Sequence, residues 1–110
     1  MYDLTFRPRE ETRAIATYQL VTWKDIPALV EARDDAGTVT RPLSERFQML
    51  IDSVAMQLGL EGSEAYVALW GRSAPEERPG SAADVADAVA GEIESRFPTY
   101  IGTALQRPAS

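Results

Sequence analysis

Six side chains in this sequence carry groups that could bind a ligand or a partner: Trp23, Lys24, Asp25, Arg46, Tyr66 and Trp70. The ammonium group of Lys24 could hold an anion, and the adjacent carboxylate of Asp25 could act as a base or orient the ligand. Arg46 would add a second cation and Tyr66 a hydroxyl group. If these four polar side chains converge on one cavity, the chain is a small anionic-metabolite-binding protein or a minimal enzyme.

The three aromatic side chains support a different hypothesis. Tyr66 and Trp70 are four residues apart and would share a helix face, where together with Trp23 they could line a groove for a partner protein. Core packing is the alternative, because aromatic rings bury large apolar areas and tolerate a wet polar end. Under this alternative Trp23 would pack between the sheet and a helix, Lys24 would lie in solvent, and Asp25 would cap the corner of the chain.

The sequence contains neither cysteine nor histidine. Disulfides, thiolate nucleophiles, cysteine-ligated iron–sulfur clusters and the standard zinc sites are therefore excluded, as are Ser–His–Asp and Cys–His arrangements. The acidic pairs Asp34–Asp35 and Glu76–Glu77 lack the alternating oxygen ligands of a calcium-binding loop, so we expect solvated turns. The sequence predicts no catalytic residue, no metal site and no cofactor, and it favours a protein that is not an enzyme.

Charge and length narrow the class of partner. With 17 acidic and 11 basic residues, the net charge of -6 opposes binding to nucleic acid or to an anionic membrane. No apolar run approaches the roughly 20 residues that span a bilayer, and the start lacks a signal-peptide pattern. We expect a cytoplasmic protein of one domain, with another protein as its partner.

Three short strands are predicted in the first half of the chain. Residues 16–23, 28–33 and 38–41 are rich in β-branched and aromatic side chains. Pro27 lacks an N–H group, so the segment around it is predicted as a corner between strands. Asp34, Asp35 and Gly37 supply turn residues before the third strand. This order predicts an antiparallel meander.

The apolar period then changes to that of a helix, with one stripe formed by Phe47, Leu50, Ile51, Val54 and Leu58. Ser44 is a suitable N-cap and Gly59 a suitable stop, so we expect this helix to cover the sheet. Ser63 would cap a second, shorter helix that runs through Trp70. On the first helix, Arg46 is predicted to bridge to Asp25 or Asp52. Met49 and Met56 could mark an adaptable contact surface, but flanking core is the preferred interpretation.

The last third of the chain predicts one more helix after a linker. Residues 74–81 form a polar segment rich in proline and glycine. Ser81 and Asp84 resemble a capping box, and Val85, Val89 and Ile93 follow on one face. Pro98 should end or kink this helix, and a weak helical turn follows. The fold class is thus α+β, a three-stranded meander followed by three helices packed on it, with residues 1–14 as a flexible lead-in and 15–107 as the domain.

Four short motifs recur in order along the chain: an aromatic followed by a basic-Asp-Ile-Pro corner, a Leu-Ser-Glu-Arg-Phe helix start, an Ile-Asp-x-x-Ala-Met core and a Glu-Ala-Tyr helix that ends in Trp. They fall at Trp23 to Pro27, Leu43 to Phe47, Ile51 to Met56 and Glu64 to Trp70. This combination resembles a bacterial family, the virulence factor domain family. Larger members carry the domain beside helical-repeat and iron–sulfur scaffold-like regions. The resemblance therefore implies an accessory, protein-interaction role; the alternatives are the metabolite-binding protein and a minor subunit of a larger enzyme.

Overall fold

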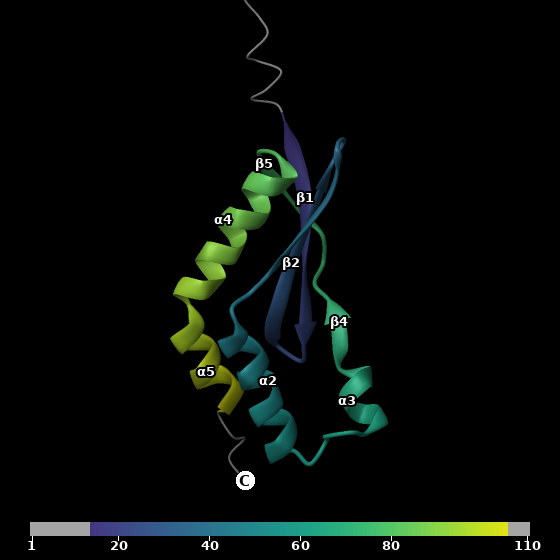
Figure 1. The fold of residues 1–110 in the computed structure, drawn as a ribbon, viewed down its shortest axis with the longest axis vertical. Coiled ribbons are helices and arrows are strands. Elements are labelled where there is room, and N and C mark those ends of the chain that lie inside the picture. The colour runs from purple at the N-terminus through teal and green to yellow at the C-terminus, as the bar shows by residue number, and fades with distance from the viewer. Residues whose placement is uncertain (1–13, 106–110) are drawn as a thin grey trace, which may run out of the picture.

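The computed structural model describes residues 14–105, which form one antiparallel sheet and four helices (Figure 1). The predicted lead-in lies outside the described residues except for Ala14, and so do the last two residues of the predicted domain. In chain order the elements are β1 (Ile15–Trp23), β2 (Ile26–Asp34), β3 (Gly37–Pro42), α2 (Glu45–Gln57), α3 (Glu64–Ala68), β4 (Trp70–Arg72), β5 (Glu76–Pro79), α4 (Ala82–Ser95) and α5 (Phe97–Leu105). The α+β fold class and the meander of the first three strands are confirmed.

Two short strands extend the meander along the free edge of β1. β4 pairs with Val21 to Trp23, and β5 pairs with Ile15 to Tyr18. Between them, Ser73 exchanges hydrogen bonds with Leu20, accepting from its N–H at 2.8 Å and donating its own N–H to the carbonyl at 2.9 Å. The prediction of a polar linker over 74–81 missed the strand β5, because β1 offers this segment unpaired backbone groups that composition does not reveal.

The corner around Pro27 is shorter than predicted. Only Lys24 and Asp25 form the turn, and β2 already includes Pro27, which lies opposite Thr22. A register shift between Val21 and Thr22 marks a bulge in β1, a place where a sheet tolerates a proline without an N–H group. Lys24 closes the turn with a φ of 53°. Its N–H donates to the carbonyl of Leu69 at 3.1 Å, which ties the turn to the end of α3.

α4 supplies most of the helical cover of the sheet. In Figure 1 α4 runs along the strands, whereas α2 lies at one end of β2, where it packs against this strand and against α5. The buried face of α4 alternates alanines with Val85, Val89 and Ile93. These small side chains let the helix approach the pleated surface closely. The expectation that α2 covers the sheet is met only at β2, because the apolar stripe of α2 shows that this helix is buried but not that α4 would cover the larger part of the strands.

Helix ends follow local chemistry where a cap is present. The hydroxyl oxygens of Ser63 and Ser81 accept from backbone N–H groups of α3 and α4 as predicted. α3 is shorter than predicted, because Trp70 pairs with Trp23 as the first residue of β4. α4 ends at Ser95, and Pro98 lies in the first turn of the nine-residue α5, where a missing N–H group costs little. The weak turn predicted after Pro98 is thus a full helix.

One continuous apolar core joins the sheet to the helices. Its largest fully buried side chains include Trp23, Phe47 and Ile51, and Phe97 and Tyr100 of α5 pack their rings on Phe47. Among the described residues no polar or charged side chain is buried. Any polar site in this part of the chain must therefore lie on the surface.

Candidate functional site

Three of the six predicted site residues form an aromatic stack at the end of the molecule where α3 lies. The rings of Trp23 and Tyr66 are 5.4 Å apart between centroids, and those of Tyr66 and Trp70 are 6.4 Å apart and nearly perpendicular. The indole N–H of Trp23 donates to the carbonyl of Tyr66 at 2.9 Å. Trp23 is 0% exposed, whereas Tyr66 and Trp70 are half-buried. Trp23 therefore belongs to the core, as the core-packing alternative predicted, and it also holds Tyr66 in place.

An open hollow lies beside the stack, between the second half of α2 and α3. Its volume is about 330 Å³, and it is lined by Asp52, Ala55, Met56, Glu61, Gly62 and Tyr66. Tyr66 forms its aromatic wall, backed by the fully buried Trp23. The hollow is thus a surface feature with a wall that is fixed by the core.

The segment that forms this hollow also carries exposed apolar side chains, of which Met56 lines the hollow itself. Met56 is 60% exposed, Leu58 50% and Val67 67%. Met49, one heptad before Met56 on α2, is 61% exposed as well, so the interpretation of both methionines as flanking core is wrong. The stripe that defines the helix does not say how wide its buried face is. We call the hollow together with Met56, Leu58 and Val67 the α2–α3 face.

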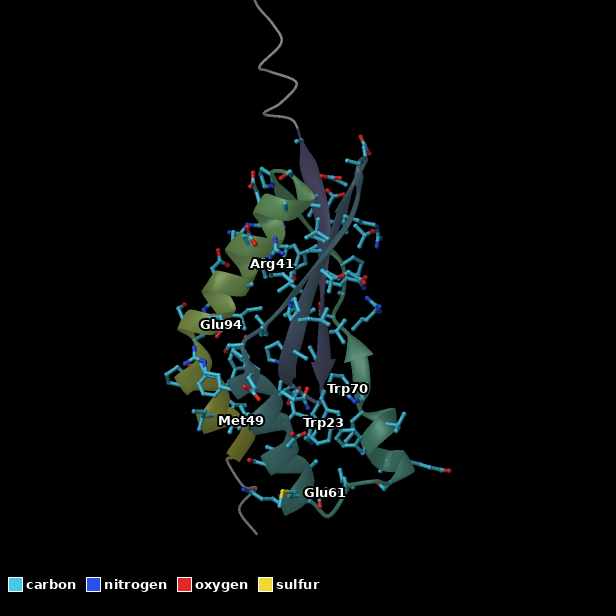
Figure 2. All side chains as sticks on the ribbon, viewed as in Figure 1. Trp23, Arg41, Met49, Glu61, Trp70 and Glu94 are labelled. Carbon is cyan, nitrogen blue, oxygen red and sulfur yellow. The ribbon has the colours of Figure 1, made fainter. Side chains whose placement is uncertain are left out.

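The charged side chains in residues 47–71, the segment that contains the α2–α3 face, are all negative. Residues 47–71 contain Asp52, Glu61 and Glu64 and no lysine or arginine. Among the described residues none of these three carboxylates has an ion-pair partner; Asp52 accepts a hydrogen bond from the amide of Gln48 at 3.0 Å. Figure 2 shows Glu61 at the tip of the molecule, beyond Trp23 and Trp70. An apolar surface with an acidic rim results.

The four polar residues of the metabolite hypothesis are not brought together. Lys24 and Asp25 are exposed in the turn between β1 and β2, and neither lines the hollow beside Tyr66. The guanidinium of Arg46 lies 4.3 Å above the ring of Phe97 and pairs with Glu94 at 3.1 Å. The predicted bridge from Arg46 to Asp25 or Asp52 is therefore wrong. Arg46 belongs to the contact between α2, α4 and α5.

Glu94 was missed by the sequence analysis, although it organises the start of α2. Its carboxylate accepts from the N–H of Ser44 at 2.5 Å, from the Ser44 hydroxyl at 2.8 Å and from Arg46. Burial raises the pKa of Glu94, but the hydrogen bonds from Ser44 and Arg46 together outweigh it and leave the pKa lowered. Ser44 does occupy the N-cap position, yet its hydroxyl does not cap α2. Nothing in the sequence signals a contact across this separation.

Asp34 has a similar linking role at the other end of α4. Its carboxylate accepts from the N–H of Ala82 at 2.8 Å and from the N–H groups of Ala36 and Gly37 in its own turn. The bond from Ala82 is the main reason why the pKa of Asp34 is lowered, and those from Ala36 and Gly37 add to it. The acidic turn is thus a structural clamp between the hairpin and α4. The expectation of a merely solvated turn was incomplete.

The described part of the chain shows neither a candidate metal site nor a membrane-spanning helix. Residues 14–105 contain no group of three or more acidic side chains placed to hold a metal ion. No helix within the same residues is long and apolar enough to cross a membrane.

Comparison with known proteins assigns the family. A family model described as Virulence factor matches residues 21–101, which run from the end of β1 into the first half of α5. Comparison with curated proteins gives no match, and comparison with solved structures gives none either. The matched range extends the resemblance seen in the sequence to α4 and α5. Because the match covers most of the 110 residues, the chain belongs to the Virulence factor family.

Proposed function

We propose that this chain is a non-enzymatic interaction module that binds a partner protein through the α2–α3 face. The observation that carries the proposal is the open hollow together with exposed apolar side chains on the segment that forms it, with Met56 and Val67 both at least 60% exposed. Folding does not require these side chains to be apolar, because they lie outside the core. Apolar surface concentrated around a concave site is typical of protein interaction sites.

The aromatic stack makes this face a rigid one. Tyr66 is held by the Trp23 hydrogen bond to its carbonyl and by the rings on either side. A preformed wall loses little side-chain entropy when a partner docks, so more of the contact energy remains as affinity. Trp70 and Tyr66 are half-buried and can present ring edges to a partner, whereas the buried Trp23 acts only through Tyr66. Lys24 and Asp25 lie in the turn that is bonded to the end of α3, and neither of them lines the hollow.

The metabolite-binding alternative gains nothing from this geometry. An anion would need cations in its site, whereas two of the six residues that line the hollow are acidic and none is basic. A role as a minor subunit of a larger enzyme uses the same docking face and differs only in what the partner does. The interaction module is therefore the function that the site supports best.

Site-specific photo-crosslinking in living cells tests the proposal. A photoreactive phenylalanine analogue at position 67 should yield a stable adduct with one partner protein, identified by mass spectrometry. The same analogue at the exposed Ala88 of α4 serves as the matched control. Adducts at position 88 and none at position 67 would contradict the proposal.

Two variants then separate docking from folding. Trp70→Ala should abolish the adduct while the far-ultraviolet circular dichroism spectrum and the unfolding transition remain cooperative. Loss of the folded state instead would assign Trp70 to the core. Val67→Ser keeps the test decisive in that case, because this side chain is 67% exposed and its replacement removes docking area alone.

A further inference from the structure

We infer that the partner segment bound by the α2–α3 face is a cationic peptide with one large apolar anchor residue, flanked by lysine or arginine. This inference rests on the proposed function and adds the chemistry of the partner. The anchor would enter the hollow against Tyr66, and the flanking cations would meet Asp52 and Glu61 on its walls. A hollow of about 330 Å³ lies at the small end of ligand pockets, roughly 300–1,000 Å³, and suits a side chain better than a large cofactor.

The distribution of basic residues carries the charge part of the inference. All lysines and arginines of the described part of the chain lie outside residues 47–71: Lys24, Arg33, Arg41, Arg46, Arg72, Arg78 and Arg96. Four of them are held in ion pairs elsewhere on the molecule. Asp52, Glu61 and Glu64 have no such partner within residues 14–105. An incoming cation would therefore meet unneutralised carboxylates.

The same charges argue against other occupants of this face. Two copies of the chain docked face to face would bring like-charged carboxylates together, and the net charge of -6 adds to the repulsion. An acidic peptide would meet the same penalty. A cationic segment gains affinity from the contact and is also steered toward it, since complementary charge raises the association rate.

Selection of short random peptides against the full chain tests the inference without assuming a sequence. Peptides that bind should carry net positive charge and one large apolar residue. The double variant Asp52→Asn, Glu61→Gln should bind the selected peptides about threefold to tenfold more weakly in fluorescence anisotropy, because two exposed ion pairs are lost. Salt should weaken wild-type binding in the same direction. The matched control is Asp35→Asn, Glu77→Gln, which removes the same charge from two exposed sites elsewhere and should leave binding unchanged.

Four results would overturn the inference. One is selection of neutral or acidic peptides that Val67→Ser weakens, which would leave the proposed function standing but refute the cationic partner. Another is equal weakening by the control variant, which would show an effect of net charge alone. Self-association in light scattering that Val67→Asp abolishes would make a second copy the occupant. Recovery of no peptide sensitive to Val67→Ser would also refute it, whereas the proposed function fails separately if the crosslinker at position 67 gives no adduct.

Discussion

The face along α4 and the α2–α3 face differ in whether their carboxylates form ion pairs. Along α4, Asp87, Glu92 and Glu94 each pair with an arginine from another element. On the α2–α3 face, carboxylates of the same types have no cation among the described residues, and apolar side chains stand in solvent beside them. Figure 2 shows the contrast, with Arg41 and Glu94 along α4 and Glu61 at the tip. Folding accounts for the first face, so the second is where a function must be sought.

The largest effect should come from the residue that supports the α2–α3 face from within. Trp23→Ala removes the largest fully buried side chain together with its hydrogen bond to Tyr66. We expect the free energy of unfolding to fall by about 3–5 kcal/mol, the usual cost of such a cavity. Urea denaturation followed by circular dichroism measures it. A loss smaller than that of an ordinary surface substitution would show that Trp23 does not stabilise the core beneath the α2–α3 face.

Acid should destabilise the contacts that carboxylates make along α4. The pKa values of Asp34, Glu92 and Glu94 are all lowered, so these groups stabilise the fold when ionised. That stability is present above the unfolded pKa values, roughly 4 for carboxylic acids, and is lost as the pH falls through the lower folded values.

Thermal unfolding at a series of pH values measures this dependence. In the triple variant Asp34→Asn, Glu92→Gln, Glu94→Gln the melting temperature should fall less steeply at acidic pH than in the wild type. In the double variant Asp52→Asn, Glu61→Gln it should fall as in the wild type. If both variants reduced the pH dependence of the melting temperature equally, the two faces would not differ in how their carboxylates stabilise the fold.

A single change at each face sharpens the comparison. Glu94→Ala removes the acceptor of the Ser44 and Arg46 hydrogen bonds, and we expect a loss of about 1–2 kcal/mol at this partly exposed site. Glu61→Ala should change stability by less than about 0.5 kcal/mol, because it breaks no contact in the described structure. Denaturation midpoints of the two variants give the result, and a larger cost for Glu61→Ala would reverse the assignment of the faces.

The smallest effect is expected for the apolar side chains of the α2–α3 face. Met56→Ser and Val67→Ser should each change stability by no more than about 0.5 kcal/mol, because both side chains are at least 60% exposed. Val54→Ser, on the buried side of the same helix α2, is the matched control and should cost several times more. If the two exposed positions cost as much as Val54, the face would be part of the core and not a docking surface.

Local patterns in the sequence predicted the elements whose causes are local. A high content of β-branched and aromatic residues marked the first three strands, and the stripe from Phe47 to Leu58 marked α2. The caps Ser63 and Ser81 began α3 and α4 as expected, since a hydroxyl three residues before a backbone N–H group is a short-range signal. Of the six predicted site residues, Trp23, Tyr66 and Trp70 do lie together, because the aromatic motifs surround one strand end and one short helix.

Packing between segments far apart in the sequence decided which elements became neighbours, and local patterns do not predict this. β4 and β5 exist because β1 has a free edge, and α4 covers the sheet because its alanines allow close approach. Arg46 pairs with Glu94 and Asp34 caps α4, contacts that join residues nearly half the chain apart. The hollow beside Tyr66 arises only where α2 and α3 meet. Residue type and spacing therefore determined which segments are strands, helices and apolar surfaces, whereas the choice of neighbours depended on shape and on the free backbone groups of elements far away in the sequence.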